Sequence, residues 1–165
     1  MKKLFFLAVA LVAMMAVSCG GGQENKIPDD FIVIDTTGYS IAVPEQFGVS
    51  YVEDNRYWSS AQHVGSLMFD YLTNGPTPAN FKEYAEKFIQ EKTDGAEPVG
   101  QPVLEADRVI VKSNRQSGNR VNHDTFFVVM GQNGKAIRGY VSLDEDSLAQ
   151  WEPKVDIIIN SIKLK

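Results

Sequence analysis

Apolar residues recur at helical spacing in two segments of this chain, and the first begins near residue 77. Its apolar residues fall at positions i, i+3, i+4, i+7 and i+8, so they share one face of a helix. They are Phe81, Tyr84, Ala85, Phe88 and Ile89. Thr77 is the predicted N-cap and Pro78 the predicted first helical residue, because proline suits a position whose N–H has no helical acceptor. The helix is predicted to end near Asp94 and Gly95.

The second helical segment lies near the C-terminus. Its apolar stripe consists of Trp151, Val155, Ile158, Ile159 and Ile162. Pro153 interrupts the segment, and a proline in a helix interior removes a backbone hydrogen bond and clashes with the preceding turn. We therefore predict that the regular helix starts at Pro153, after a looser turn from Ser147.

The remaining apolar residues follow strand spacing, in short runs separated by glycine, proline and polar residues. The runs before the first helix are 31–35, 39–44, 47–53, 58–63 and 64–72, and those between the helices are 99–104, 108–112, 124–130 and 136–143. Asn133 and Gly134 predict a tight hairpin between the last two runs, because both residues tolerate a positive φ. The polar residues 113–122 are predicted to form a hairpin loop.

Several strands, one helix, several more strands and a second helix thus follow one another along the chain. Neighbouring strands joined by short turns favour a central antiparallel β-sheet with two main helices packed on it, which is the α+β class. The pattern shows no internal repeat and predicts a single domain.

A different pattern occupies the N-terminus. Lys2 and Lys3 precede residues 4–17, which carry no charge, and small residues lead into Cys19. This arrangement resembles the bacterial lipoprotein signal, in which the cysteine is acylated and becomes the first residue of the mature protein. A transmembrane helix is the alternative, but it needs about 20 apolar residues, and this run is shorter.

The signal implies a division of the chain and a location. Residues 1–18 are the predicted signal peptide, residues 19–27 a flexible glycine-rich tether, and residues 28–165 the folded domain. Lipid on Cys19 would anchor the domain to a membrane of the bacterial cell envelope. Gly20 stands where proteobacterial lipoproteins of the inner membrane carry aspartate, and this favours the outer membrane.

Charge and cysteine content narrow the possible partners. The formal net charge of the chain is −5, and loss of Lys2 and Lys3 with the signal brings it to −7. Nucleic-acid binders carry basic patches, so an acidic domain of this kind is a poor candidate for that class. Cys19 is the only cysteine, and its acylation leaves no thiol for a disulfide, a cysteine nucleophile, a zinc–thiolate site or an iron–sulfur cluster.

Beyond the signal, the chain resembles the PsbP/Mog1-like superfamily, which includes the DcrB-like bacterial lipoproteins. The matching parts are the paired runs 39–44 and 47–49, the helix 81–91 and the C-terminal stretch 157–162, which ends in Asn160-Ser161-Ile162. Many members carry tryptophan where this chain carries Phe47. The resemblance covers nearly the whole mature chain and implies a central antiparallel sheet with flanking helices. It also implies a non-enzymatic role in binding or assembly.

The sequence shows no motif for catalysis, and it predicts neither a metal site nor a cofactor. His63 and His123 could bind a metal with Asp70 or Asp124 as a carboxylate ligand, but no ligand spacing supports this. Solvent-facing histidines are the plainer interpretation. No G-x-S-x-G motif or phosphate-binding loop is present.

Arg56, Tyr57 and Trp58 are the candidate interface residues, because aromatic residues beside an arginine often anchor protein contacts. Aromatic residues within strands are more often core residues, and this alternative stays open. Arg115 and Arg120 could meet an acidic partner, although a solvated hairpin tip explains them more simply.

Two functional hypotheses follow. The first is a lipid-anchored, non-catalytic binding or assembly module with a protein partner in the envelope. The second is an envelope protein that binds a small ligand or a metal, with weak hydrolase activity as an extension. Separately, Asp35-Thr36-Thr37 and Asp146-Ser147-Leu148 resemble an O-glycosylation sequon of bacterial envelope proteins.

Overall fold

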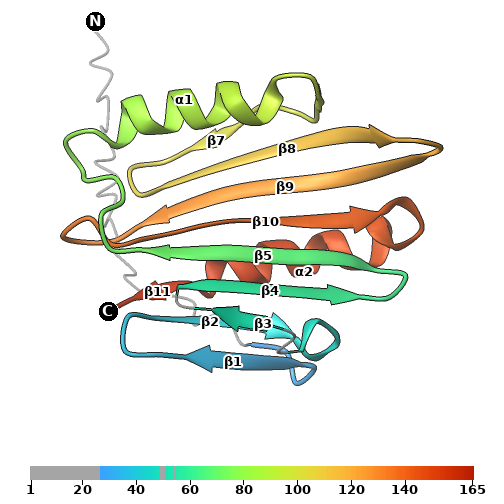
Figure 1. Ribbon diagram of the computed structural model, residues 1–165, viewed down its shortest axis with the longest axis horizontal. Coiled ribbons are helices and arrows are strands. Elements are labelled where there is room, and N and C mark those ends of the chain that lie inside the picture. Colours follow the sequence, from blue (N-terminus) through green and yellow to red (C-terminus); the bar gives the residue numbers. More distant parts are fainter. Residues whose placement is uncertain (1–26, 49–50, 54) are drawn as a thin grey trace, which may run out of the picture.

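Two antiparallel sheets and two α-helices form the fold in the computed structural model, which describes residues 27–48, 51–53 and 55–165 (Figure 1). The main sheet has eight strands, and its order is β3-β4-β5-β10-β9-β8-β6, with β7 also paired to β8. Its strands are β3 (Tyr51–Glu53), β4 (Arg56–Ala61), β5 (Gly65–Leu72), β6 (Glu97–Pro98), β7 (Val103–Leu104), β8 (Arg108–Ser117), β9 (Arg120–Met130) and β10 (Ala136–Asp144). Every pairing is antiparallel, so the predicted α+β class and central antiparallel sheet are confirmed.

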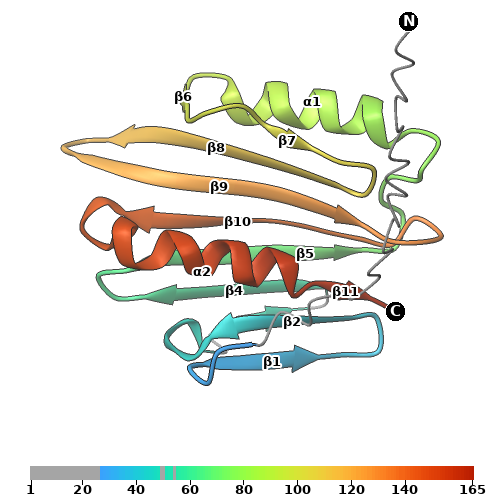
Figure 2. The ribbon, with the colours of Figure 1, turned by 180° about the vertical axis from the view of Figure 1, so that it is seen from behind.

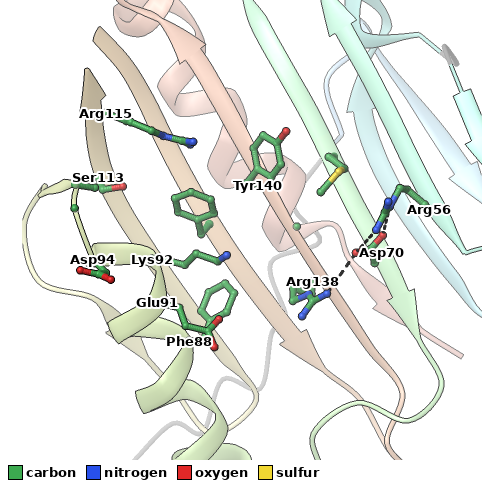
Figure 3. Close-up of a pocket in the computed structure, with 15 residues that line it drawn as sticks. Arg56, Asp70, Phe88, Glu91, Lys92, Asp94, Ser113, Arg115, Arg138 and Tyr140 are labelled. Carbon is green, nitrogen blue, oxygen red and sulfur yellow. Dashed lines mark hydrogen bonds and ion pairs between the residues drawn. The ribbon is translucent and has the colours of Figure 1, made fainter. Parts of the chain in front are cut away.

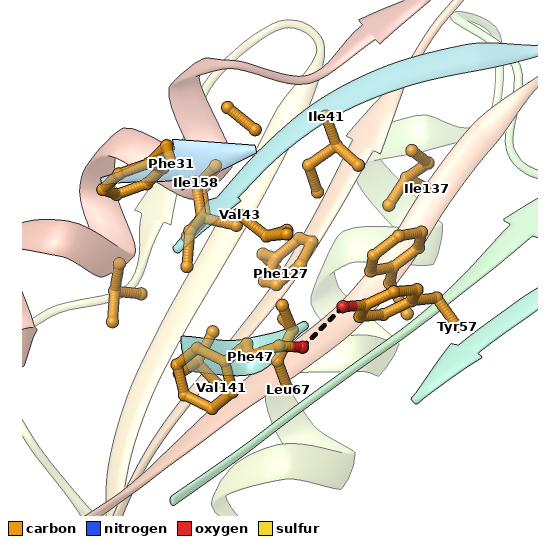
Figure 4. Close-up of a cluster of buried hydrophobic side chains, with 14 of the residues drawn as sticks. Phe31, Ile41, Val43, Phe47, Tyr57, Leu67, Phe127, Ile137, Val141 and Ile158 are labelled. Carbon is orange, nitrogen blue, oxygen red and sulfur yellow. Dashed lines mark hydrogen bonds between the residues drawn. The ribbon is translucent and has the colours of Figure 1, made fainter. Parts of the chain in front are cut away.

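A smaller sheet and one helix cover one face of the main sheet. The smaller sheet consists of β1 (Phe31–Asp35), β2 (Tyr39–Pro44) and β11 (Lys163–Leu164). Figure 2 shows the helix α2 (Leu148–Asn160) lying over β10, β5 and β4 on this side, nearly along the strands. Buried side chains from all three parts form one apolar cluster, which Figure 4 shows around Phe47 and Phe127.

The helix α1 (Phe81–Thr93) lies on the opposite face of the main sheet and covers only part of it. Its buried residues are Phe81, Ala85 and Phe88. They pack against β8 and β9 in a second, smaller apolar cluster that includes Val111 and Val128. The α1-side surface of β4, β5 and β10 has no helix over it in the described part of the chain (Figure 1).

Strand alternation decides which side chains reach each face. On β5, Leu67 and Phe69 are fully buried on the α2 side, whereas Met68 and Asp70 alternate with them and lie on the α1 side. Gly139 on β10 belongs to the α2 side, and a Cβ there would lie 2.5 Å from the Met68 carbonyl oxygen and 2.8 Å from Phe127 Cζ. The close approach of β5 and of the Phe127 ring to this position therefore requires glycine.

Both helices form where the apolar spacing predicts, but both predicted starting residues are wrong. α1 begins at Phe81 because residues 77–80 form a turn, in which Asn80 Oδ1 accepts a hydrogen bond from the Thr77 backbone N–H at 2.7 Å. α2 begins at Leu148, directly after a 3-10 turn at Glu145–Ser147, and Pro153 lies inside it. That 3-10 turn provides a preformed helical start, which ends six residues before the proline.

Two strand predictions also need correction. The polar stretch 113–122 is not a loop, because β8 and β9 continue through it and pair up to Ser117 and Arg120. Among the described residues of the predicted run 47–53, Tyr51–Glu53 form a strand, whereas Phe47 ends the 3-10 turn Glu45–Phe47. The predicted turn at Asn133 and Gly134 is confirmed, with φ values of 56° and 74°.

The C-terminal end of α2 is fastened to the smaller sheet through one serine. Ser161 Oγ donates to the Ile158 carbonyl at 2.7 Å and accepts the Ala42 backbone N–H at 2.8 Å. Ser161 therefore links the last turn of α2 to β2, which gives a physical reason for the serine in the C-terminal pattern.

The predicted signal peptide, most of the tether and the lipidation site Cys19 lie outside the described residues. In the part of the chain that is described, no helix is long and apolar enough to cross a membrane.

Candidate functional site

The uncovered part of the main sheet is the candidate functional site, and we call it the open face. It is the α1-side surface of β4, β5 and β10. Its side chains are Arg56, Trp58, Met68, Asp70, Arg138 and Tyr140. Strand register brings these residues, up to 84 positions apart in sequence, into adjacent rows.

The first row of the open face is apolar and aromatic. Trp58 pairs with Met68, and Met68 pairs with Tyr140 on the next strand. Trp58 is 42 % exposed, although it occupies the middle of a strand whose neighbouring residues Tyr57 and Ser59 are fully buried. A large apolar side chain left exposed in mid-strand is typical of a contact surface.

The second row is charged. Arg56 Nε donates to Asp70 Oδ1 at 2.7 Å, and Arg138 Nη2 lies 3.6 Å from Asp70 Oδ2. Asp70 is the middle residue of this row, and its side chain is only 13 % exposed. Two guanidinium groups therefore share one carboxylate, and the row carries an excess of positive charge.

A pocket of about 490 Å³ lies between the open face and the C-terminal end of α1, and we call it the α1 pocket (Figure 3). Phe126 and Tyr140 lie on its sheet side, with ring centroids 5.9 Å apart. Lys92 comes from the last turn of α1, and its Nζ lies 5.2 Å from the Phe126 ring centroid and 5.6 Å from that of Phe88. Cation–π contacts with two rings hold this ammonium group beside the pocket.

A buried polar group lies under one side of the pocket. Asp124 is 1 % exposed and accepts a hydrogen bond from Arg115 Nε at 2.9 Å. Ser113, its cross-strand neighbour, is 2 % exposed and lines the pocket, and its Oγ has no hydrogen-bond partner in the structure. An unpaired buried hydroxyl is uncommon, because leaving it without a partner costs free energy.

The structure separates the three predicted interface residues. Arg56 and Trp58 lie on the open face, but Tyr57 points to the opposite side and is fully buried. Its hydroxyl lies 2.8 Å from the Phe47 carbonyl oxygen, its ring stacks on Phe69 at 4.8 Å, and burial raises its pKa. The prediction of Tyr57 as an interface residue is therefore wrong, because strand alternation sends it into the core.

The candidate metal ligands do not converge. His63 lies in the turn between β4 and β5, and His123 Nδ1 lies 2.8 Å from Asn114 Oδ1. Asp70 and Asp124 are paired with arginines. Among the described residues, no three His, Cys, Asp or Glu side chains lie close enough to hold a metal ion.

In both segments that resemble a glycosylation sequon, the hydroxyl group is hydrogen-bonded to the backbone. Ser147 is 6 % exposed, and its Oγ lies 2.8 Å from the carbonyl oxygens of Val64 and Asp144. Thr36 Oγ1 donates to the Tyr39 carbonyl at 3.0 Å and accepts the Tyr39 N–H at 3.1 Å. A glycan at Ser147 would require this turn to open.

Sequence reasoning did not identify Asp70, Arg138, Lys92, Phe126 and Tyr140 as one site. The available signal was a charged residue inside each of two alternating strands, Asp70 and Arg138. Their proximity depends on the pairing of β5 with β10, which joins segments on either side of α1.

Comparison with known proteins shows the class of fold. No protein-family model and no curated protein sequence matches this chain. Among solved structures, the chain is similar to cyanobacterial PsbP (CyanoP) from Synechocystis sp. PCC 6803, with a TM-score of 0.53 and 16 % identity over 90 % of this chain and 98 % of that one. It is also similar to the Saccharomyces cerevisiae Ran-binding protein Mog1p, with a TM-score of 0.55 and 8 % identity over 81 % of this chain and 95 % of that one.

These two structures give the chain a PsbP/Mog1-like fold, which confirms the resemblance seen in the sequence. At 16 % and 8 % identity the similarity concerns the fold, and the function has to be argued from the open face and the α1 pocket.

Proposed function

We propose that this protein is a non-catalytic binding module of the bacterial cell envelope, anchored by lipid on Cys19, whose open face docks a protein partner. The observation that carries the proposal is the exposure of Trp58 beside Met68, on a sheet surface that α1 leaves uncovered. Tryptophan is enriched among the residues that dominate binding energy at protein interfaces.

The composition of the open face suits a protein interface. An apolar row of Trp58, Met68 and Tyr140 lies beside a charged row in which Arg56 and Asp70 are already paired. Protein interfaces combine an apolar centre with a polar rim. The partner would place an apolar side chain against Trp58 and Met68, and hydrogen-bonding groups over the charged row.

The position of the segment that leads into β1 supports a tethered arrangement. The described chain begins at residue 27 and leads into β1, which belongs to the smaller sheet on the α2 side of the main sheet. A membrane anchor attached there would leave the open face, on the other side, accessible to a partner.

The fold is compatible with a binding role. The similar structure Mog1p is described as a Ran-binding protein, so a chain with this architecture can bind another protein. This supports the class of function and identifies no partner for the present chain.

Affinity capture from native membranes after brief crosslinking tests the proposal. The unaltered protein should recover a reproducible partner, and Cys19→Ala should recover less of it, because the domain is no longer held at the membrane. Trp58→Ala should lose the partner. Val33→Ala is the matched control, since Val33 is also an exposed apolar side chain but lies on β1. Loss of the partner with Val33→Ala and retention with Trp58→Ala would contradict docking on the open face.

A further inference from the structure

The α1 pocket contains two cations that have no carboxylate within hydrogen-bond distance. Arg138 Nη2 is 3.6 Å from Asp70, and Arg56 has the shorter contact with that carboxylate at 2.7 Å. Lys92 makes no ion pair in the described part of the chain, and its Nζ lies over the rings of Phe88 and Phe126. Figure 3 shows both groups directed toward the pocket, from the sheet and from α1.

The acidic residues that line the pocket neutralise these two cations only in part. The Asp70 carboxylate accepts its short hydrogen bond from Arg56 and lies 3.6 Å from Arg138 Nη2. Glu91 and Asp94 also line the pocket, but both are exposed residues at the end of α1, where water screens their charge. An anion between Lys92 and Arg138 would therefore gain two charge-assisted contacts.

The remaining walls are suited to an apolar group. The Phe126 and Tyr140 rings lie side by side at an interplanar angle of 50°, and Phe88 faces them from α1. Ser113 Oγ, buried and without a partner, adds one unused hydrogen-bonding group. The volume of about 490 Å³ falls in the range of small-molecule sites, which combine apolar walls with a few polar groups.

We infer that the α1 pocket binds a small organic anion, in which a carboxylate or phosphate group is carried on a flat apolar body. The anionic group lies between Arg138 and Lys92, and the apolar body lies against Phe126 and Tyr140. The pocket shares Arg138 and Tyr140 with the open face, so the inference extends the proposed function by a ligand of defined chemistry. Its binding can be measured without the partner protein.

Titrations of the unaltered protein with four probes of similar size test the inference. Benzoate and phenyl phosphate carry the expected anion, benzyl alcohol is neutral and benzylamine is a cation. Both anions should bind saturably, with shifts of the Ser113, Phe126 and Tyr140 amide signals in nuclear magnetic resonance spectra. Added salt should weaken the binding, because the cations are partly exposed. The tighter of the two anions identifies the group that the pocket prefers.

Two charge-removing variants and two matched controls make the test specific. Arg138→Gln and Lys92→Gln should each weaken anion binding by about tenfold, the loss expected for one charge-assisted hydrogen bond. The controls remove exposed cations elsewhere: Arg120→Gln on the β8–β9 hairpin and Lys82→Gln on the solvent side of α1. Both controls should leave anion binding unchanged. Unchanged thermal midpoints would show that all four variants are folded.

The inference is overturned if neither anion binds saturably, if benzyl alcohol binds as well as benzoate, or if the control variants weaken binding as much as Arg138→Gln. No partner protein is present in the titration, so a negative result there does not bear on the docking proposal. That proposal is tested by the capture experiment.

Discussion

The opposite orientations of Tyr57 and Trp58 give the sharpest test of the fold and of the open face together. The two residues are neighbours on β4, and the structure buries Tyr57 completely while it leaves Trp58 42 % exposed. Replacing a fully buried large aromatic residue by alanine costs about 3–5 kcal/mol, because a cavity remains. The Tyr57 ring also stacks on Phe69, and its hydroxyl contacts the Phe47 carbonyl, so Tyr57→Ala should fall near the upper end of that range.

Trp58→Ala should cost less, about 1–2 kcal/mol, because the side chain borders solvent and its removal leaves no closed cavity. Urea unfolding followed by far-ultraviolet circular dichroism measures both variants without relying on tryptophan emission. With a slope of about 2 kcal/mol per molar urea, the middle of the typical range, Tyr57→Ala should lower the midpoint by about 2 M and Trp58→Ala by about 0.5–1 M. Tyr57→Phe, which removes only the hydroxyl, should cost about 1 kcal/mol and provides a folded variant if Tyr57→Ala does not fold. An equal or larger loss for Trp58→Ala would refute the assignment of faces on β4.

Three further predictions follow from the same packing. Iodide should quench the fluorescence of Trp58, which is 42 % exposed, but not that of Trp151, which is 4 % exposed. Trp58→Phe should therefore remove the quenched part of the emission, and quenching that survives this substitution unchanged would be inconsistent with these exposures. Gly139→Ala should destabilise the protein by about 1–3 kcal/mol in the same urea assay, because the added Cβ overlaps the Met68 carbonyl oxygen, Phe69 Cβ and the Phe127 ring. A neutral effect would show that β5 and β10 are farther apart. A hydrogen bond from Lys154 lowers the pKa of Asp30 below its ordinary 3.8. The stabilising contribution of Asp30 is therefore present above pH 3.8 and is lost as the pH falls through the lowered pKa. The Asp30→Asn variant should lose less stability on acidification, and an acid unfolding curve identical to that of the unaltered protein would oppose this.

Local patterns were sufficient to predict much of the fold. The apolar spacing from Phe81 onward identified α1, and Asn133-Gly134 identified its hairpin turn, because each signal depends on residues close in sequence. The helix starts were missed because they depend on other contacts. Asn80 completes a turn that excludes Pro78 from α1, and Ser147 Oγ contacts the distant Val64 carbonyl where α2 begins.

The β8–β9 hairpin shows a second limit of pattern reading. Its outer half is polar on both faces, so hydrophobic alternation gives no strand signal there. Pairing of the two strands nevertheless continues to Ser117 and Arg120, with Gly118 at a φ of 61° in the turn. Backbone hydrogen bonds extend the strands here, and Val121 alone does not produce an apolar alternation that would mark them.

The site was predictable only in part. Arg56 and Trp58 were identified because aromatic residues beside an arginine often anchor protein contacts. Alternation along β4 places Tyr57 on the opposite face of the sheet from these two residues. The pairing of Asp70 with Arg138, and the approach of Lys92 to Phe126, join segments that are distant in sequence. These contacts follow from the strand order, in which β10 lies between β5 and β9.

Site-specific photo-crosslinking in native membranes tests the central claim most directly. A photoreactive amino acid replaces Met68, at the centre of the open face, or Val33, an exposed residue on β1 of the smaller sheet. If the open face docks a protein partner, the Met68 position should give a discrete crosslinked product and the Val33 position should not. A product from Val33 alone, or products of equal yield from both positions, would contradict the account.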